Sequence, residues 1–213
     1  MIQWLRDNGS RVWQLSLTHA WLSGVPLVIG LAIALPLGWL AHRLPRLRLT
    51  ITSLAGVLYT VPSLVLFILL PLMLGTKILD PINVVVAMTL YTVALLVRTV
   101  ADGLAAVPDD VRQAALAMGF GRFRRLVGVE LPLAVPVISA GLRVAAVSNV
   151  SIVSVAALIG VVQLGSLFTE GFSLLYLPPI LVGTLACLVL AVVFDVVIVV
   201  LTRMATPWLR RTA

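Results

Sequence analysis

Long stretches without a charged side chain alternate with short clusters of charge along this chain. Five stretches lack Asp, Glu, Lys and Arg altogether, namely 12–42, 49–76, 81–97, 144–169 and 171–194. About 20 apolar residues, rising about 1.5 Å each as a helix, cross a bilayer. The pattern therefore predicts five membrane-spanning helices, at about 15–41, 51–75, 81–101, 136–157 and 178–203.

The two ends of the chain differ from these stretches. In residues 1–14, Trp4 and Trp13 alternate with Arg6 and Arg11, which is typical of a short helix lying in the membrane interface. The first apolar run is longer than the core of a signal peptide, and no small-residue cleavage site follows it, so we do not expect cleavage. Residues 206–213 are expected to form a short tail.

Composition supports a membrane protein. Hydrophobic residues make up 61% of the 213-residue chain and charged residues 11%, with a mean hydropathy of +1.15. Soluble domains are about a quarter charged, and one core of this size could not bury so much apolar surface. These values exclude an ordinary soluble domain and a disordered chain, and the single cysteine, Cys187, excludes a disulfide scaffold. The predicted fold class is an all-α membrane protein.

The basic residues fall mostly on one side of the predicted membrane. Three groups of arginines follow the first, third and fifth spans, whereas three basic residues flank the opposite ends. After the first span come Arg43, Arg46 and Arg48, after the third Arg112, Arg122, Arg124 and Arg125, and after the fifth Arg203, Arg210 and Arg211. The opposite ends carry Arg6, Arg11 and Lys77. The positive-inside rule then predicts an N-terminus outside, and a loop 102–135 and C-terminus in the cytoplasm.

Few residues in this chain could carry chemistry. Lys77, the one lysine, follows Gly75 and Thr76 without the glycine-rich lead-in of a phosphate-binding loop, and the two histidines, His19 and His42, have no clustered thiols or carboxylates nearby. We expect no catalytic residue, metal site or cofactor in this chain, and no enzyme activity of its own.

The loop 102–135 has its own helical pattern. Pro108 followed by two aspartates favours a helix start; Val111, Ala114, Ala115 and Met118 then recur at helical spacing, and Gly119 can end the helix. A second short helix would carry Phe123 among arginines. Such a loop could rest on lipid headgroups, or it could insert into a groove on a soluble partner.

The spacing within this loop resembles a known signature. Permease subunits of ATP-binding-cassette importers carry Glu-Ala-Ala, three residues, Gly, nine residues, Ile, one residue and Leu-Pro. Here the same intervals separate Gln113-Ala114-Ala115, Gly119 and Val129-Glu130-Leu131-Pro132, with Gln113 in place of the glutamate and Val129 in place of the isoleucine.

The resemblance implies a type I importer permease fold of about five spans with a cytoplasmic coupling helix, in the inner or plasma membrane. It also implies that two permeases form the pathway, that two cytoplasmic ATPases bind ATP and Mg²⁺, and that an extracytoplasmic binding protein delivers the solute. The residues it assigns to ATPase coupling are Gln113, Ala114, Ala115, Met118, Gly119, Phe120, Phe123, Leu131 and Pro132.

Further segments resemble permeases for osmoprotectants such as glycine betaine, carnitine and choline. They are Thr60–Leu64, 97–99 and 140–143, together with the ends of a glycine-rich stretch at Gly160 and Gly165, whose middle departs as Val161-Val162-Gln163. A permease for methionine or another small solute is an alternative. An ion-driven secondary carrier and an integral-membrane enzyme are alternatives from other classes.

Polar residues inside the spans have two interpretations each. Asp195 could pair with Arg98 or Arg143, or the arginines could extend to the interface. The serines of the fourth span could join helices or line the pathway, and Tyr59 could contact a quaternary ammonium or be an ordinary membrane aromatic. The pathway and gate candidates are Tyr59, Pro62, Ser63, Ser148, Ser151, Ser154 and Gln163.

Overall fold

The computed structural model describes residues 2–208, which form helices and their connections without a strand. The helices, in chain order, are α1 (Ile2–Arg43), α2 (Pro45–Thr60), α3 (Ser63–Leu74), α4 (Pro81–Ala105), α5 (Asp109–Ala117), α6 (Arg122–Arg125), the π-helical turn η1 (Leu126–Glu130), α7 (Leu131–Val153), the 3₁₀ turn η2 (Ser154–Ile159), α8 (Ser166–Ser173) and α9 (Leu177–Ala205).

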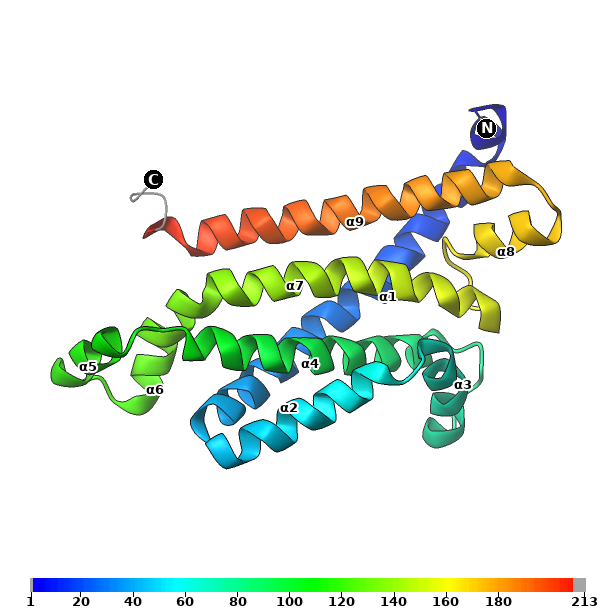
Figure 1. Ribbon diagram of the computed structural model, residues 1–213. Helices are drawn as coiled ribbons and strands as arrows, with labels where there is room; N and C mark the ends of the chain where they lie inside the picture. The colour runs from blue at the N-terminus through cyan, green and yellow to red at the C-terminus, as the bar shows by residue number, and fades with distance from the viewer. Residues whose placement is uncertain (1, 209–213) are drawn as a thin grey trace.

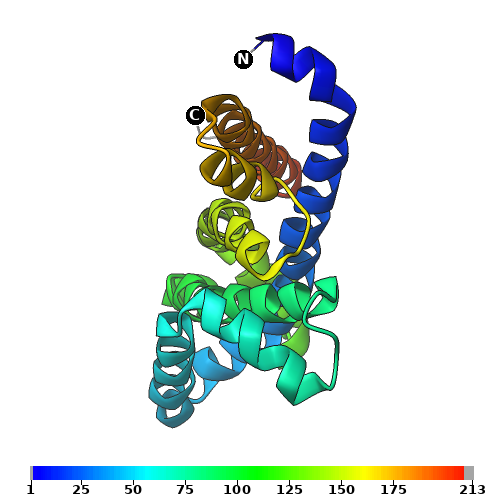
Figure 2. The same ribbon diagram turned by 90° about the vertical axis from the view of Figure 1, so that its right-hand side faces the viewer.

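The long helices form a stack. In Figure 1, α9, α7, α4 and α2 lie one below the next, and α1 crosses them obliquely. The view turned by 90° places α1 along one side of the stack (Figure 2). The strongest packing joins α1 to α4, followed by α4 to α7 and α7 to α9. α4 is therefore the central helix, and α9 contributes an outer face that is largely uncovered by the rest of the chain.

Small residues allow α1 to approach α4 closely. Gly30, Ala34 and Gly38 recur every four residues on one face of α1. A Cβ atom at Gly30 would lie 2.5 Å from a methyl carbon of Thr92, and one at Gly38 would lie 2.5 Å from Cβ of Val100. The backbones of α1 and α4 therefore gain van der Waals contact. Such packing drives helix association in a membrane, because lipid supplies no hydrophobic driving force between helices.

The span expected at 51–75 is not one continuous helix. α2 ends at Thr60 and α3 begins at Ser63, and the two are bent by 101°. Pro62 has no N–H group and pushes Val61 into an extended conformation, with φ −64° and ψ 129°. The bend removes the Val61 carbonyl from the helical hydrogen-bond pattern, and the hydroxyl of Tyr91 donates to it instead.

The boundary expected after residue 14 is also wrong as a helix boundary, because α1 runs unbroken from Ile2 to Arg43. The N-terminal part is held by tertiary contacts: Leu15 packs in a buried cluster with Leu164 and Leu167, and Arg11 pairs with Glu170 at 2.5 Å. These contacts continue the helix beyond its membrane-length stretch. Its position in a membrane interface stays a prediction.

The loop expected at 102–135 is shorter than predicted. α4 continues to Ala105, and α7 begins at Leu131 rather than near 136. Pro132 occupies the first turn of α7, where the missing N–H costs no helical bond. α9 covers the expected span 178–203, while α8 had no predicted counterpart. Of the tail, 209–213, including Arg210 and Arg211, lies outside the described residues.

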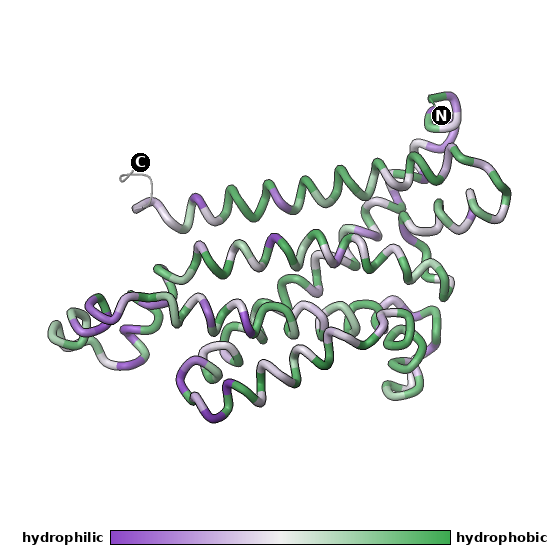
Figure 3. Tube along the Cα trace, viewed as in Figure 1, coloured by the Kyte–Doolittle hydropathy of each residue, from purple (hydrophilic) through white to green (hydrophobic). Residues whose placement is uncertain are grey.

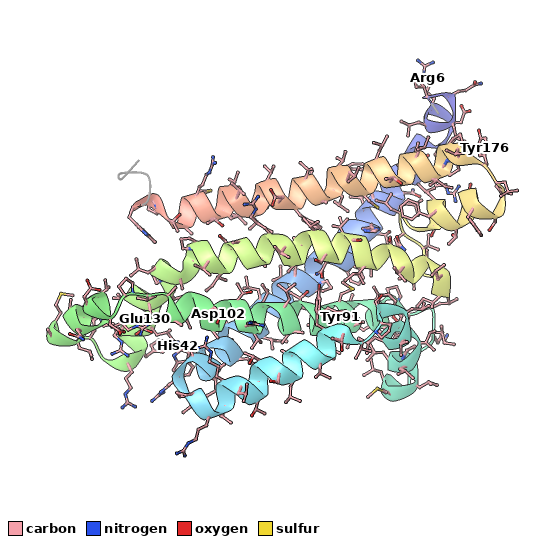
Figure 4. The ribbon with its side chains drawn as sticks, in the orientation of Figure 1. Arg6, His42, Tyr91, Asp102, Glu130 and Tyr176 are labelled. Atoms are coloured by element: carbon pink, nitrogen blue, oxygen red, sulfur yellow. The ribbon has the colours of Figure 1, made fainter. Side chains whose placement is uncertain are left out.

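Within residues 2–208, four helices are long and apolar enough to cross a membrane: α1, α4, the helical run Arg122–Ile159, and α9. The bent pair α2 and α3 makes a fifth if it is counted as one span. Hydrophilic residues gather at the ends of the stack, at the α1–α2 turn and around α5 and α6 (Figure 3). His42, Asp102 and Glu130 lie at one end, and Arg6 and Tyr176 lie at the other (Figure 4).

Candidate functional site

The loop between α4 and α7 is built around a sharp helix end. The N–H of Phe120 donates to the carbonyl of Ala115 at 3.0 Å, and that of Gly119 donates to Leu116 at 2.9 Å. This pair of bonds is the Schellman arrangement, which needs a left-handed residue after the helix. Gly119 supplies it with φ +79°. The glycine of the signature thus has a backbone role.

Five of the nine predicted coupling residues face outward. These are Gln113, Ala114, Met118, Gly119 and Phe123. Met118 is 68% exposed and Phe123 is 77% exposed, an unusual position for large apolar side chains in a polar loop. The exposed edge of α5 and α6 is therefore suited to contact another protein.

The other coupling candidates pack inside the loop. Ala115 is 1% exposed, and its carbonyl accepts from Phe120 in the Schellman turn; its role in coupling stays a prediction. Phe120 is half-buried, with the Arg124 guanidinium 5.0 Å from its ring centroid. Leu131 and Pro132 are half-buried in the first turn of α7, and they position the loop rather than form its outer edge.

Two arginines fix the loop to the long helices. Arg112 of α5 donates to the carbonyl of Leu104 in α4 at 2.7 Å and pairs with Asp109 at 2.9 Å. Arg125 of α6 pairs at 2.6 Å with Glu130, whose side chain is 5% exposed. Arg112 thus connects α5 to α4, and Arg125 holds α6 to the end of η1, the turn that leads into α7.

The bend between α2 and α3 brings three pathway candidates together. Tyr59, Pro62 and Ser63 all lie within this short segment. The rings of Tyr59 and Tyr91 meet edge to face, with centroids 5.8 Å apart. In the sequence, Tyr91, like Tyr59, could contact a quaternary ammonium or be an ordinary membrane aromatic. In the structure, its hydroxyl donates to the Val61 carbonyl and holds the bend.

Buried polar contacts join α7 to its neighbours. Asn149 Nδ2 donates to the hydroxyl of Thr92 in α4 at 3.0 Å and to the carbonyl of Ser23 in α1 at 3.2 Å. In the sequence, Asn149 belongs to the polar run of the fourth span but lies off the face that Ser148, Ser151 and Ser154 share. Of the serines, Ser151 is exposed and its carbonyl accepts from Ser154 Oγ at 2.6 Å, while Ser148 is half-buried.

Gln163 is a fully buried junction. Its Nε2 donates to the carbonyls of Val153 and Ser154, each at 3.1 Å, and its Oε1 accepts from the N–H of Gly165 at 2.5 Å. The same Oε1 lies 2.9 Å from Nδ1 of His19.

The other ring nitrogen of His19 also faces an acceptor. His19 Nε2 lies 2.9 Å from the carbonyl of Val150. His19 and Gln163 thus connect α1, α7 and the segment before α8. Neither contact could be read from the sequence, because 144 residues separate the two side chains.

Arg143 and Arg98 have different carboxylate partners, and Asp102 also pairs with Arg48 of α2 at 2.7 Å. Arg143 Nε and Asp195 Oδ1 are 2.5 Å apart, and Arg143 Nη2 and Asp195 Oδ2 are 2.9 Å apart, a two-point pair between α7 and α9. Arg98 lies 3.8 Å from Asp102 of its own helix instead. Of the two partners expected for Asp195, the structure therefore has Arg143.

Breaking the α7–α9 pair is expected to lower the yield of folded protein. Arg143→Gln and Asp195→Asn should each reduce the monodisperse fraction on size-exclusion chromatography severalfold, because each leaves one unpaired charge at membrane depth. The double variant should recover most of the yield. Equal yields from the single and double variants would show that the pair does not couple the two helices.

The stacked apolar helices define the class of helical membrane proteins. The loop at one end of the stack has an exposed edge that is suited to contact a separate protein. The sequence pattern of a transporter family, described as "Binding-protein-dependent transport system inner membrane component", matches residues 16–211. The chain belongs to this family, the membrane components of ATP-binding-cassette importers.

Characterised relatives align along almost the whole chain. The chain is 32% identical over 209 residues to the osmoprotectant import permease protein OsmW of Salmonella typhimurium, covering 97% of each protein. It is 28% identical to the choline transport system permease protein OpuBB of Bacillus subtilis, covering 97% of this chain and 94% of that one.

Solved structures share the fold. A chain of the inward-facing MetNI methionine ABC transporter matches with a TM-score of 0.82 at 17% identity, covering 96% of this chain and 98% of that chain. A chain of an amino acid ABC transporter with histidines matches with a TM-score of 0.73 at 17% identity, covering 92% and 97%. At these identities the likeness supports the predicted type I importer fold.

Proposed function

We propose that this chain forms half of the pathway by which an importer takes up a small osmoprotectant such as glycine betaine, carnitine or choline. The observation that carries the solute class is the full-length similarity to an osmoprotectant import permease, at 32% identity. The resemblance at Thr60–Leu64, 97–99 and 140–143 favours the same group. The serines Ser148, Ser151 and Ser154, with Tyr59, Pro62, Ser63 and Gln163, remain the pathway and gate candidates.

In this proposal the loop of α5 and α6 docks in a groove on a cytoplasmic ATPase, which binds ATP and Mg²⁺, while this chain binds neither and catalyses nothing. Closure of two ATPases brings two such loops together and opens the pathway outward, and hydrolysis returns it inward. The contacts of Arg112 and Arg125 support this role, because they connect the loop to α4 and α7.

The proposal also includes two further protein partners and an orientation of the chain in the membrane. A second permease, either a copy or a related chain, completes the pathway, and an extracytoplasmic binding protein delivers the solute. The N-terminus lies outside and the C-terminus in the cytoplasm of a cell that carries the protein in its inner or plasma membrane. The gathering of arginines at the end of the stack with α5 and α6 supports this orientation.

Uptake in reconstituted vesicles tests the proposal. The chain, reconstituted with an ATPase, a second permease and a binding protein from the same genome, should take up radiolabelled glycine betaine or choline only when ATP is present. Uptake should persist when an ionophore removes the membrane potential. Uptake that stops with the potential and continues without ATP would instead support an ion-driven carrier. ATP-dependent uptake of methionine alone would overturn the solute class.

A further inference from the structure

A basic cavity lies beside the loop, apart from its exposed outer edge. It has a volume of about 460 Å³ and lies between the end of α1 and the segment from α5 to η1. Its walls include the following charged side chains: Arg43, Arg112, Arg122, Arg125 and Glu130. His42 also lines it, and Figure 4 places His42 and Glu130 at the same end of the helix stack.

The positive charge in this cavity exceeds what the chain neutralises. Arg125 is paired with Glu130, and Arg112 with Asp109. Within residues 2–208, Arg43 and Arg122 form no ion pair. In the same described part, the buried Nε of Arg112 has no hydrogen-bond acceptor.

The buried Nε of Arg112 lacks an acceptor, and the charges of Arg43 and Arg122 are not neutralised by an ion pair. Burying such groups costs free energy unless an anion accepts the hydrogen bond and balances the charge. Phosphate oxygens suit such a cluster, because guanidinium groups bind them through paired hydrogen bonds. The cavity therefore has the chemistry of a phosphate-binding site.

An apolar groove adjoins the basic cavity. It has a volume of about 270 Å³, and Trp39 lines both spaces. The Arg43 guanidinium lies 5.4 Å from the Trp39 ring centroid. The groove runs between α1, α4 and the segment from α6 to the start of α7. Its walls include Leu35, Pro36, Val100, Leu104, Leu126 and Phe123, and Phe123 also belongs to the exposed edge of the loop.

We propose that the cavity and groove together bind one anionic phospholipid. The phosphate lies among Arg43, Arg112 and Arg122, and one acyl chain lies along the groove past Trp39. An acidic side chain from a partner would neutralise the charge and leave the apolar groove empty, and a free phosphate would do the same. A lipid fills both parts, and basic pockets between membrane helices bind such headgroups elsewhere.

Native mass spectrometry of the intact transporter tests this site, with added phosphatidylglycerol as the probe. Arg43→Gln combined with Arg122→Gln should weaken phosphatidylglycerol binding about thirtyfold, since each arginine near an anionic lipid contributes about fivefold in affinity. The matched control is Arg46→Gln combined with Arg124→Gln. It removes the same charge from the first turn of α2 and from α6, at residues that do not line the cavity, and it should bind as the parent does.

Unmodified protein gives a second measurement that needs no variant. Phosphatidylcholine should bind far more weakly than phosphatidylglycerol, and neither inorganic phosphate nor glycerol phosphate should displace the lipid at comparable concentration. Displacement by either would show a free-anion site and overturn the lipid assignment. A cavity variant that keeps its lipid and loses the ATPase would show instead that these arginines serve partner docking. Because lipid binding is measured directly, its failure is distinct from a failure of ATP-driven uptake.

Discussion

Replacing Gly119 with aspartate is expected to reduce solute uptake more than about tenfold while the protein inserts and folds normally. Gly119 has φ +79°, and a Cβ atom there would meet no other atom within 4 Å, so the space outside the turn is open. Aspartate adopts the left-handed conformation more readily than most residues. The Schellman turn should therefore persist, and the new carboxylate should point from the edge that we propose docks on the ATPase.

The loss follows from the cost of a charge at a packed protein interface. An unpaired charge buried there costs about 2–5 kcal/mol, and each 1.4 kcal/mol corresponds to about tenfold in binding. Transport in vesicles and co-purification of the ATPase would both be measured. ATPase activity should continue and become independent of the solute.

Gly119→Asn is the matched control for this variant. Asparagine has the same shape and the same tolerance of positive φ, and it carries no charge. It should retain most of the uptake. If Gly119→Asp also transported normally, Gly119 would lie outside the docking surface. If both variants failed equally, the defect would be in the turn rather than in the contact.

The sequence predicted the fold class because apolar length and charge position are local properties. The spans that form α1, α4, α7 and α9 could be read from their own residues, and the helix start at Pro108 and the helix end near Gly119 follow from capping chemistry alone. The spacing from Gln113 to Pro132 could likewise be read directly. The structure places α5 at Asp109–Ala117 accordingly.

The features that the sequence did not predict depend on distant contacts. A proline inside an apolar run is compatible with a kink or with a full break, and the 101° bend at Pro62 needed Tyr91 of another helix to satisfy the Val61 carbonyl. The sequence could not decide between Arg98 and Arg143 as the partner of Asp195, because both are arginines within predicted spans. Packing of α7 on α9 selected Arg143.

The contacts of the segment between Gly160 and Gly165, before α8, also could not be predicted from the sequence. Its departure from a glycine-rich pattern, Val161-Val162-Gln163, left Gln163 as a gate candidate without showing its contacts. In the structure, Gln163 contacts His19 of α1 and donates to the carbonyls of Val153 and Ser154, where α7 meets η2. Gly165, which keeps the family residue, lies against these contacts.

Gly165→Ala is expected to destabilise the protein by more than about 3 kcal/mol, beyond the usual range for overpacking. A Cβ atom at Gly165 would lie 2.1 Å from the backbone carbonyl oxygen of Ser154 and 2.8 Å from Nε2 of Gln163. A backbone oxygen cannot rotate away as a side chain can. The segment must therefore shift, and the hydrogen bonds of Gln163 are lost with it.

Thermal unfolding of the detergent-purified protein measures this effect, and Gly9→Ala provides the control. Gly9 lies in α1, and a Cβ atom there meets nothing within 4 Å, so alanine should leave stability unchanged or raise it slightly through helix propensity. A Gly165→Ala protein that unfolds at the parent temperature would show that the Gln163 segment is loosely held.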